Sequence, residues 1–449
     1  AHGAAMEGCR LGVTTTAAAI LAKVSAVGEM GGVEIARLAP LFASEGEYEA
    51  FCVRHARDRI RRGNLAAYRG EAYLGVDAGS TTIKLVLVGA DGEVLLDSYA
   101  PSGGDVLVRA RAMLSQLYAR LPADDAGVPL VHIGHATVTG YGEGLLKEAL
   151  RIDSGEVETV AHLAGAEALL PGVEFVLDIG GQDMKCLRVR AGAIEHIMLN
   201  ETCSSGCGSF ISTFARSQGM TVEEFAQVAL FASAPADLGS RCTVFMNSRV
   251  KQAQKECATP GDIAAGLSYS VVKNALLKVI RLRDVSEMGE KIVVQGGTFL
   301  NDAVLRAFEL FVGKDVVRPD AAGTMGAYGA ALIARRHACE VGGRCRSTLL
   351  GPAQLDALRV SQRTTRCRRC TNHCLLTVSD FDVVDGDEEG GAPGDVSRDR
   401  RRRFVTGNRC ERGARAFSRR LRATEAAPNI VAFKTHLLFD RAPLPIERA

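Results

Sequence analysis

The 449-residue sequence lacks three features that would each point to a particular class of protein. No apolar run approaches the length of about 18 residues that a membrane-spanning helix needs, so we expect no transmembrane segment and no membrane partner. A strong net charge is also missing. The 54 Lys and Arg against 52 Asp and Glu leave +2, which argues against nucleic acid as a partner. The third missing feature is the Walker phosphate loop, GxxxxGK followed by Ser or Thr, which excludes that type of nucleotide site.

Cysteine, in contrast, is frequent. Thirteen cysteines in a chain without an export signal indicate a reducing compartment, and we expect the cytoplasm. Seven of the thirteen fall into two groups with settings that suggest ligands. The others are interpreted as structural or incidental: Cys9, Cys52, Cys186, Cys257, Cys339 and Cys345.

The character of the sequence changes along the chain, which predicts an α/β protein with distinct parts. Residues 1–70 are charged and periodic and predict a helical linker, compatible with the remnant of an upstream unit. Short β-branched runs then alternate with Ala- and Leu-rich stretches, which predicts one lobe over 71–175 and a second over 176–340. Residues 345–449 are rich in Arg and Cys, and we expect a metal-binding segment and the start of a further domain there. The sequence begins without Met and ends without an evident stop to the fold, so we expect a piece of a longer protein.

Two stretches, YLGVDAGSTTIKLVLV and FVLDIGGQDMKCLRV, share one pattern of strand, Asp, glycine turn, Lys and strand. The spacing from Asp77 to Lys84 is the same as that from Asp178 to Lys185, and the glycines allow the backbone to approach an anion closely. A single turn of this kind is more often an ordinary tight turn. A repeat with matched spacing predicts two facing lobes that bind the phosphates of ATP, with the two carboxylates near Mg²⁺.

The candidate nucleotide-site residues divide by role. Asp77, Asp178 and Gln182 are predicted to be catalytic. The residues predicted to contact the nucleotide are Gly79, Ser80, Thr81, Thr82, Lys84, Gly180, Gly181, Lys185, Gly296 and Gly297. The last two belong to KIVVQGGTFLND, a strand and turn that can lie flat against an adenosine. The later stretch AAGTMGAYGAALIA predicts a small-residue helix, for which close packing and ligand contact are equally good explanations.

These elements, in this order, resemble the superfamily of acetate and sugar kinases, heat-shock chaperones and actin. Within it, DAGSTTIK, DIGGQDMK, NETCSSGCGSF, CTVF and QGGTFLND together resemble the activator ATPases of 2-hydroxyacyl-CoA dehydratases and benzoyl-CoA reductases, over residues 71–338. The flanking sequences resemble long-form members, in which another ATPase unit precedes this one and another domain follows. The resemblance implies an α/β fold of two ribonuclease-H-like lobes around a nucleotide cleft, with a small Cys-rich C-terminal segment.

The resemblance also implies a role for two cysteines that their local sequence leaves unexplained. In this family, the two cysteines at the positions of Cys203 and Cys242 together supply half the ligands of a 4Fe-4S cluster shared across a two-fold dimer. Without the resemblance, two such separated cysteines are more often core residues. Cys207, one helical turn from Cys203, is interpreted as a bystander. Gly323 stands where activators often carry a polar side chain, which leaves the adenosine contacts there open.

The function implied is ATP-driven transfer of a low-potential electron from the cluster to a dehydratase or reductase. The implied electron donor is a ferredoxin or flavodoxin, and the implied assembly is a homodimer or a pairing with a second ATPase unit. The alternative is a sugar-kinase-like phosphotransferase acting on a small hydroxy compound, which needs a carboxylate base against a substrate hydroxyl. A non-redox ATPase module, a third alternative, would leave Cys203 and Cys242 without a role.

A second group of cysteines lies near the C-terminus. Cys367, Cys370 and Cys374 form the pattern C-x2-C-x3-C, and Cys410 follows after a long acidic and then basic loop. Three close thiols and a distant fourth favour a tetrahedral Zn²⁺ site or a second iron–sulfur cluster, and the spacing does not decide between them.

Glu158 and His162 form one further pair of potential ligands. They are four residues apart and would share a face of a helix, as metal ligands sometimes do. Because such a pair is more often a structural contact, we place it outside the metal site.

Overall fold

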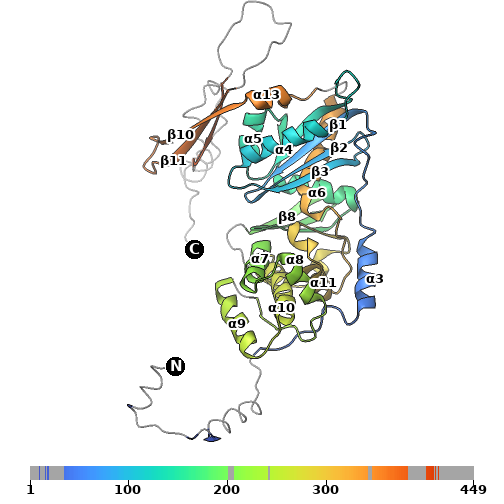
Figure 1. The fold of residues 1–449 in the computed structure, drawn as a ribbon, viewed down its shortest axis with the longest axis vertical. Coiled ribbons are helices and arrows are strands. Elements are labelled where there is room, and N and C mark those ends of the chain that lie inside the picture. The colour runs from blue at the N-terminus through green and yellow to red at the C-terminus, as the bar shows by residue number, and fades with distance from the viewer. Residues whose placement is uncertain are drawn as a thin grey trace, which may run out of the picture.

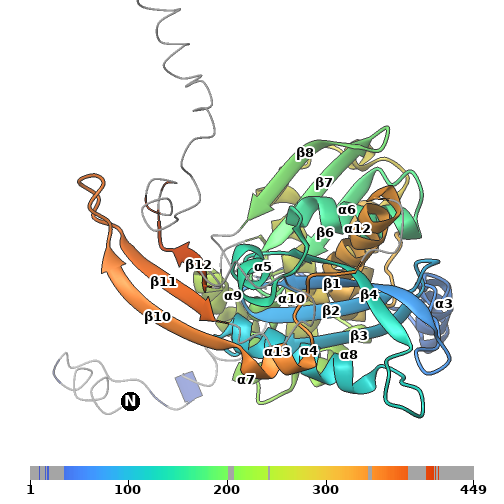
Figure 2. The same cartoon turned by 90° about the horizontal axis from the view of Figure 1, so that it is seen from above.

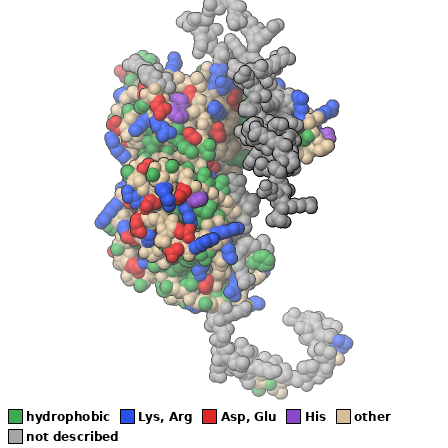
Figure 3. Space-filling model, turned by 180° about the vertical axis from the view of Figure 1, so that it is seen from behind, with side chains coloured by type: hydrophobic (Ala, Val, Ile, Leu, Met, Phe, Trp, Pro, Cys, Tyr) green, Lys and Arg blue, Asp and Glu red, His purple; other side chains and the backbone are tan. Residues whose placement is uncertain are grey.

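Two α/β lobes lie one above the other, and a small third sheet lies beside the first lobe (Figure 1). The computed structural model describes residues 35–200, 207–240, 243–341, 346–382 and 401–408, and positions 10, 16, 18, 19, 410 and 413. Within these residues, no helix combines the length and the apolar character needed to cross a membrane. Acidic and basic side chains are interspersed on the back of the molecule (Figure 3), in keeping with the small net charge.

Lobe I is built on a five-stranded sheet with the strand order β3-β2-β1-β4-β5. The strands are β1 (Gly70–Ala78), β2 (Thr82–Val88), β3 (Val94–Pro101), β4 (Val131–Thr139) and β5 (Ser154–Gly155). The central strand β1 is buried from Ala72 onward, because helices cover both faces of the sheet. Alternate residues of β1 face α4 (Val106–Arg120) and α5 (Glu143–Leu150) on one side.

Lobe II repeats this order with one strand fewer, β8-β7-β6-β9. Its strands are β6 (Phe175–Ile179), β7 (Met184–Arg190), β8 (Ala193–Asn200) and β9 (Ile292–Gln295). Strand β6 is antiparallel to β7 and parallel to β9, as β1 is to β2 and β4. Asp77 stands opposite Lys84 in one ladder, and Asp178 stands opposite Lys185 in the other. The duplication predicted from the spacing is therefore confirmed at the level of strand register.

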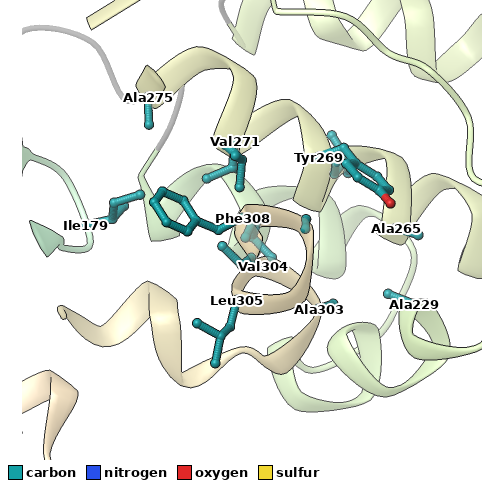
Figure 4. Packing of buried hydrophobic residues seen from close by; sticks show 14 of the residues in the cluster. Ile179, Ala229, Ala265, Tyr269, Val271, Ala275, Ala303, Val304, Leu305 and Phe308 are labelled. Atoms are coloured by element: carbon teal, nitrogen blue, oxygen red, sulfur yellow. The ribbon is translucent and has the colours of Figure 1, made fainter. Parts of the chain in front are cut away.

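The helices of lobe II pack together and form its hydrophobic core. They are α7 (Gly208–Ser217), α8 (Val222–Leu230), α9 (Thr243–Lys255), α10 (Pro260–Lys273) and α11 (Asp302–Val312), with short turns η1 (Asn274–Val279), η2 (Val285–Met288) and η3 (Gly297–Leu300). Phe308 of α11 lies between Ile179 and Val271 (Figure 4), and all three are buried. Burial of one such side chain stabilises the fold by about 1.5–3 kcal/mol. Because Ile179 directly follows Asp178, this core anchors the second of the two predicted phosphate hairpins.

The N-terminus of α10 shows how local sequence sets an element of this lobe. The Thr259 hydroxyl accepts a hydrogen bond from the Asp262 amide at 3.1 Å, and the Asp262 carboxylate accepts one from the Thr259 amide at 3.0 Å. This reciprocal pair is a capping box, and Pro260 fits the first helical position because its missing amide hydrogen needs no partner there.

Two helices run between the lobes, α6 (Glu158–Leu169) and α12 (Met325–Val341), the latter after the turn η4 (Ala322–Thr324). They lie side by side (Figure 2), so close that a Cβ on Gly329 would stand 1.7 Å from the Ala161 carbonyl oxygen. Small residues of α12 therefore serve close helix packing, one of the two explanations considered from the sequence. Although α12 falls in the interval predicted for the second lobe, it packs on the lobe I sheet opposite α4 and α5.

The segment of residues 35–69, here named the strap, joins lobe II before it reaches lobe I. Phe42 and Phe51 are buried in the lobe II core. The helix α3 (Glu45–His55) lies along that lobe (Figure 1). In α3, Arg54 donates hydrogen bonds of 2.7 and 2.6 Å to the buried carboxylate of Glu309, so the strap is an integral part of lobe II.

After α3 the strap crosses from lobe II to lobe I. The Gly63 amide donates to the Val94 carbonyl of β3 at 2.9 Å. The Arg62 side chain donates to Asp97 of β3 at 3.1 Å and to Asp320, near η4, at 3.4 Å. Arg62 thus connects β3 to the segment that leads into η4.

The C-terminal part forms a separate three-stranded antiparallel sheet beside lobe I (Figure 2). It consists of β10 (Arg359–Arg366), β11 (Leu375–Asp382) and β12 (Arg401–Thr406), and α13 (Pro352–Ala357) precedes it. Phe381 joins the lobe I core, and Phe404 contacts α5 so closely that a Cβ on Gly144 would lie 2.8 Å from its ring. The sheet is therefore docked on lobe I through two aromatic side chains.

Candidate nucleotide site and cysteine positions

The two glycine-rich turns meet where lobe I faces lobe II. The Ser80 hydroxyl donates to Gln182 Oε1 at 3.4 Å, which joins the two turns directly. Both of these side chains are exposed, whereas Asp77 and Asp178 are only 2% and 5% exposed. The structure therefore brings the predicted residues of both hairpins together, with polar groups at the mouth and two carboxylates at the base.

The Asp77 carboxylate has one satisfied and one unsatisfied oxygen. Its Oδ2 accepts from Lys84 Nζ at 2.9 Å, whereas its buried Oδ1 has no hydrogen-bond partner among the described residues. Two glycines keep the space around it open. A Cβ on Gly140 would lie 2.9 Å from Oδ1, and one on Gly326 would lie 2.8 Å from Oδ2. A buried acceptor without a partner costs about 1–3 kcal/mol, which a cation or its water would recover.

The surroundings of Asp178 are more crowded. His162 Nδ1 lies 3.3 Å from Asp178 Oδ2, and His162 Nε2 lies 3.7 Å from Glu158 Oε1. Lys185 Nζ contacts Glu158 Oε1 at 2.9 Å and Asp183 Oδ2 at 2.5 Å. The base of lobe II is thus a continuous cluster of alternating charges.

The protonation equilibria of this cluster follow from burial and from neighbouring charges. Burial raises the pKa of Asp178. Burial acts in the same direction on Glu158, but the hydrogen bond with His162 and the charge of Lys185 outweigh it and lower the Glu158 pKa to about 2. Burial acts to lower the His162 pKa, yet the charge of Asp178 and the hydrogen bond with Glu158 raise it.

Sequence reasoning set Glu158 and His162 aside, although both lie at the base of this cleft. Their spacing on one helix was visible, but it does not reveal what the helix faces. The available signal was position along the chain, because α6 leads into β6, the strand that carries Asp178 near its end. Residues near the start of the helix before such a strand lie toward the edge of the sheet at which that strand ends.

The charges of the base fit a divalent cation. The carboxylates are Asp77, Glu158, Asp178 and Asp183, and the ammonium groups are Lys84 and Lys185. Four negative charges against two positive ones leave two negative charges, without counting His162. Mg²⁺ prefers oxygen ligands and keeps several waters, so the unsatisfied Asp77 oxygen suits it.

Glycines and one aromatic side chain line the side of the cleft predicted for adenosine. Gly296 has φ +91°, and a Cβ there would lie 2.3 Å from the Ile179 carbonyl oxygen, so the turn requires glycine. Tyr99 of β3, which is 52% exposed, extends over the lobe II turns. Its hydroxyl lies 3.8 Å from the Cβ position of Gly297, and its ring lies 3.7 Å from that of Gly323. The sequence around Tyr99 did not indicate this position, because it depends on how β3 packs against η4.

Comparison with known proteins identifies the family. The model of the BadF/BadG/BcrA/BcrD ATPase family matches residues 74–334, more than half of the chain. The chain belongs to this ATPase family. It is 30% identical over 262 residues to the 2-hydroxyisocaproyl-CoA dehydratase activator of Clostridioides difficile, covering 58% of this chain and 94% of the relative.

Solved structures agree with this assignment of the ATPase. Component A of (R)-2-hydroxyglutaryl-CoA dehydratase from Acidaminococcus fermentans is 28% identical, with a TM-score of 0.53, covering 60% of this chain and 99% of that one. The activator of the 2-hydroxyisocaproyl-CoA dehydratase from Clostridium difficile with bound ADPNP is also 28% identical, with a TM-score of 0.52, covering 60% and 96%. The predicted family and the fold of two ribonuclease-H-like lobes are confirmed. The whole strap and the C-terminal sheet lie outside the residues that match the family.

The two cysteines predicted to hold a cluster in this ATPase, Cys203 and Cys242, lie outside the described residues. Their neighbours are described. Cys207 is the N-cap of α7 and is fully buried in the lobe II core, a setting that suits a bystander better than a ligand. The helix α9 begins at Thr243, directly after Cys242.

The start of α7 is bonded to the second phosphate turn of the ATPase. The Gly208 amide donates to the Gly180 carbonyl at 2.9 Å, and the Ser209 amide donates to the Gly181 carbonyl at 2.8 Å. The Thr298 hydroxyl also donates to the Gly180 carbonyl, at 3.0 Å. The predicted phosphate turn, the predicted adenosine turn and the helix after Cys203 therefore share one set of hydrogen bonds.

The backbone of the C-terminal sheet groups the other predicted ligands at one end. The Cys367 amide donates to the Cys374 carbonyl at 2.8 Å and closes the hairpin that contains Cys370. Strand β12 runs antiparallel to β11, so Cys410 follows at the hairpin end of the sheet. Among the described residues, however, no group of three or more His, Cys, Asp or Glu side chains is arranged to hold an ion. The metal site of this segment stays a prediction.

We expect the purified full chain to contain zinc, or iron that persists after Cys203→Ala, bound through the C-terminal cysteines. Cys367→Ser or Cys410→Ser should each remove most of this metal, because a tetrahedral site loses one of its four thiolates. Elemental analysis measures the content. Cys339→Ser, an exposed cysteine of α12, is the matched control and should change nothing. Unchanged metal in both test variants, or metal absent from the parent chain, would mean that the cysteines are structural.

Proposed function

We propose that this ATPase uses ATP hydrolysis to drive a low-potential electron from a 4Fe-4S cluster to a partner acyl-CoA dehydratase or reductase. Membership of the family supports the ATPase part, and the relative named as a 2-hydroxyisocaproyl-CoA dehydratase activator supports the class of partner. The electron donor would be a ferredoxin or flavodoxin, and the reaction would take place in the cytoplasm.

One observation carries the proposal, the hydrogen bonds between the start of α7 and the second phosphate turn. Gly180 and Gly181 accept from the first two residues of α7, and Cys203 lies five residues before that helix. The start of α7 packs closely against the two turns, because a Cβ on Gly208 would stand 2.8 Å from the Thr298 hydroxyl and 3.6 Å from Gly181 Cα. A shift of the turn on nucleotide binding would therefore be passed to α7 and to the segment that bears Cys203.

The residues present fit an iron–sulfur cluster that is shared between two ATPase units. Cys242 directly precedes α9, and the amide groups at a helix N-terminus favour the thiolate form. Cys203 lies five residues before α7, and the family resemblance supports its role as a ligand. A 4Fe-4S cluster needs four thiolates, so a second copy or a second ATPase unit must supply the other two. When bound, the cluster would supply one-electron chemistry at low potential.

The described residues of the cleft would perform the hydrolysis. Asp77 and Asp178 would hold the hydrated Mg²⁺, and Lys84 and Lys185 would neutralise phosphate oxygens. Gln182, exposed at the mouth beside Ser80, would orient the attacking water. Closure of the two lobes would exclude bulk water from the base, where Asp77 and Asp178 are already buried.

The proposal is tested on protein purified without oxygen, through its iron content and its magnetic-resonance spectrum. We expect about two iron atoms per chain, half of a four-iron cluster. Adding Mg-ATP to the reduced protein should change the spectrum, and adding Mg-ADP should give a different change, because the phosphate turn and α7 move together. An iron-bearing protein whose spectrum is indifferent to nucleotide would overturn the coupling. An iron-free protein that phosphorylates small hydroxy compounds would support the phosphotransferase alternative instead.

A further inference from the structure

His162 lies at the base of the cleft, where α6, β6, β9 and α12 meet. Its side chain is only 7% exposed. The Gln295 side-chain amide lies 2.7 Å from Nδ1, and Asp178 Oδ2 lies 3.3 Å from the same atom. Because a ring nitrogen that accepts from an amide N–H cannot also donate, Nδ1 donates to Asp178 when Gln295 turns its amide oxygen, which has no other partner among the described residues, toward the ring. Gln295 and Asp178 are neighbours in the parallel ladder of β9 and β6. The imidazole therefore rests against two adjacent strand ends of lobe II.

The other ring nitrogen faces the helices that join the lobes. Nε2 lies 3.7 Å from Glu158 Oε1, one turn earlier on α6. On the α12 side, a Cβ added to Gly326 would lie 2.9 Å from Nε2 and also 2.8 Å from Asp77 Oδ2. One point of the α12 backbone thus touches both His162 and Asp77. His162 and Gly326 form a continuous contact from the aspartate of lobe II to the aspartate of lobe I.

The composition of these contacts argues against an ordinary core histidine. The ring is surrounded by Asp178, Glu158 and Asp77, with Lys185 as the nearby cation. A residue that only filled space between helices would be as effective if it were apolar, whereas a donor beside a buried carboxylate fixes the direction in which its oxygens point.

We propose that His162 is a positioning residue for the ATPase site, which fixes the Asp178 carboxylate through Nδ1 and thereby sets how the paired aspartates hold the hydrated Mg²⁺. The inference rests on the nucleotide assignment of the cleft, and it does not involve the cluster. The proposal gives the positioning role to Nδ1, which faces Asp178, and not to Nε2, which faces Glu158.

Three variants of His162 test this separation. His162→Asn places an amide near the position of Nδ1, His162→Gln places one near that of Nε2, and His162→Ala removes both groups. Binding of a fluorescent ADP analogue is measured with Mg²⁺ and with EDTA, beside kcat and KM for ATP. We expect His162→Ala and His162→Gln to lower kcat and Mg²⁺-dependent binding by about 10-fold, with metal-free binding and KM nearly unchanged. His162→Asn should restore most of the loss.

Gly326→Ala is an independent variant that leaves His162 in place. The added methyl group would stand 2.8 Å from Asp77 Oδ2 and 2.9 Å from His162 Nε2, so both side chains must shift. Mg²⁺-dependent binding should fall more than metal-free binding, and the crowding is also expected to lower Tm, since overpacking outweighs the better helix propensity of alanine. His135→Gln, a half-buried histidine of β4 bonded to Ser154, is the control and should behave like the parent.

Two results would overturn the inference. One is a His162→Ala protein that keeps its Mg²⁺ dependence, and the other is an equal loss of binding with and without Mg²⁺ accompanied by a lower Tm. Asp178→Asn separates failure of this inference from failure of the cleft assignment. If Asp178→Asn also leaves Mg²⁺-dependent binding intact, both ideas fall; if Asp178→Asn abolishes it and His162→Ala does not, only the role of His162 falls.

Discussion

Asp77→Asn and Asp178→Asn are each expected to lower the rate of Mg²⁺-dependent ATP hydrolysis by at least about 100-fold. Each substitution keeps the shape of the side chain and removes one negative charge from a base in which four carboxylates face two ammonium groups. Asp77→Asn also leaves Lys84 without its 2.9 Å ion pair. Loss of either carboxylate is expected to lower the affinity for hydrated Mg²⁺, so turnover is measured over a range of Mg²⁺ concentrations.

The matched control for these variants is Asp97→Asn. Asp97 lies on β3, in the same lobe as Asp77. Its carboxylate pairs with Arg62 and contacts none of the charged residues at the base of the cleft. This variant should hydrolyse ATP at the parent rate, and all three variants should keep their far-UV spectra. Parent-level turnover in both cleft variants would show that the duplicated hairpins do not form the nucleotide site.

Cys203→Ala and Cys242→Ala are each expected to remove nearly all the iron bound between two ATPase units, from about two atoms per chain to almost none. A cluster that takes two thiolates from each side does not survive with one side reduced to a single thiolate. Nucleotide binding should stay measurable, because neither cysteine belongs to the phosphate hairpins. Iron content and visible absorbance measure the cluster, and binding of a fluorescent nucleotide to the same sample measures the nucleotide site.

Two other cysteines make this test specific. Cys257→Ala alters an exposed thiol just after α9 and should keep all the iron. Cys207→Ala alters the buried N-cap of α7 and should also keep it, although stability is expected to fall because a core side chain is truncated. Iron that survives loss of both Cys203 and Cys242 and is not held by the C-terminal cysteines, or iron that depends on Cys207 instead, would contradict the assignment of the ligands.

The duplicated architecture was accessible from the sequence because it depends on short-range spacing. In each hairpin the distance from Asp to Lys fixes which residues stand opposite each other, so Asp77 faces Lys84 and Asp178 faces Lys185. A strand has a period of two, and a slip of one residue would move the whole apolar set to the other face. The register was therefore strongly specified, and with it the placement of both carboxylates.

The parts that sequence reasoning missed depend on contacts between distant segments. His162 meets Gln295 across 133 positions, and Arg54 meets Glu309 across 255. Gly140 and Gly326 read as ordinary turn and helix residues, and their proximity to Asp77 arises only when β4 and α12 pack against β1. The spacing of residues in the sequence does not predict such long-range contacts.

The strap has a practical consequence for anyone who shortens this protein. Trimming the chain to the residues that match the family would remove Phe42 and Phe51 and uncover the apolar surface of lobe II on which they rest. It would also remove Arg54 and His55 from the buried Glu309 carboxylate, which would keep only the longer contacts with Arg306 at 3.9 Å and the Val316 amide at 3.4 Å. Breaking a buried ion pair in this way is destabilising. A recombinant ATPase domain should therefore start upstream of residue 35. A domain that begins at residue 74, where the family match begins, would expose apolar surface, and we expect it to be less stable and to aggregate.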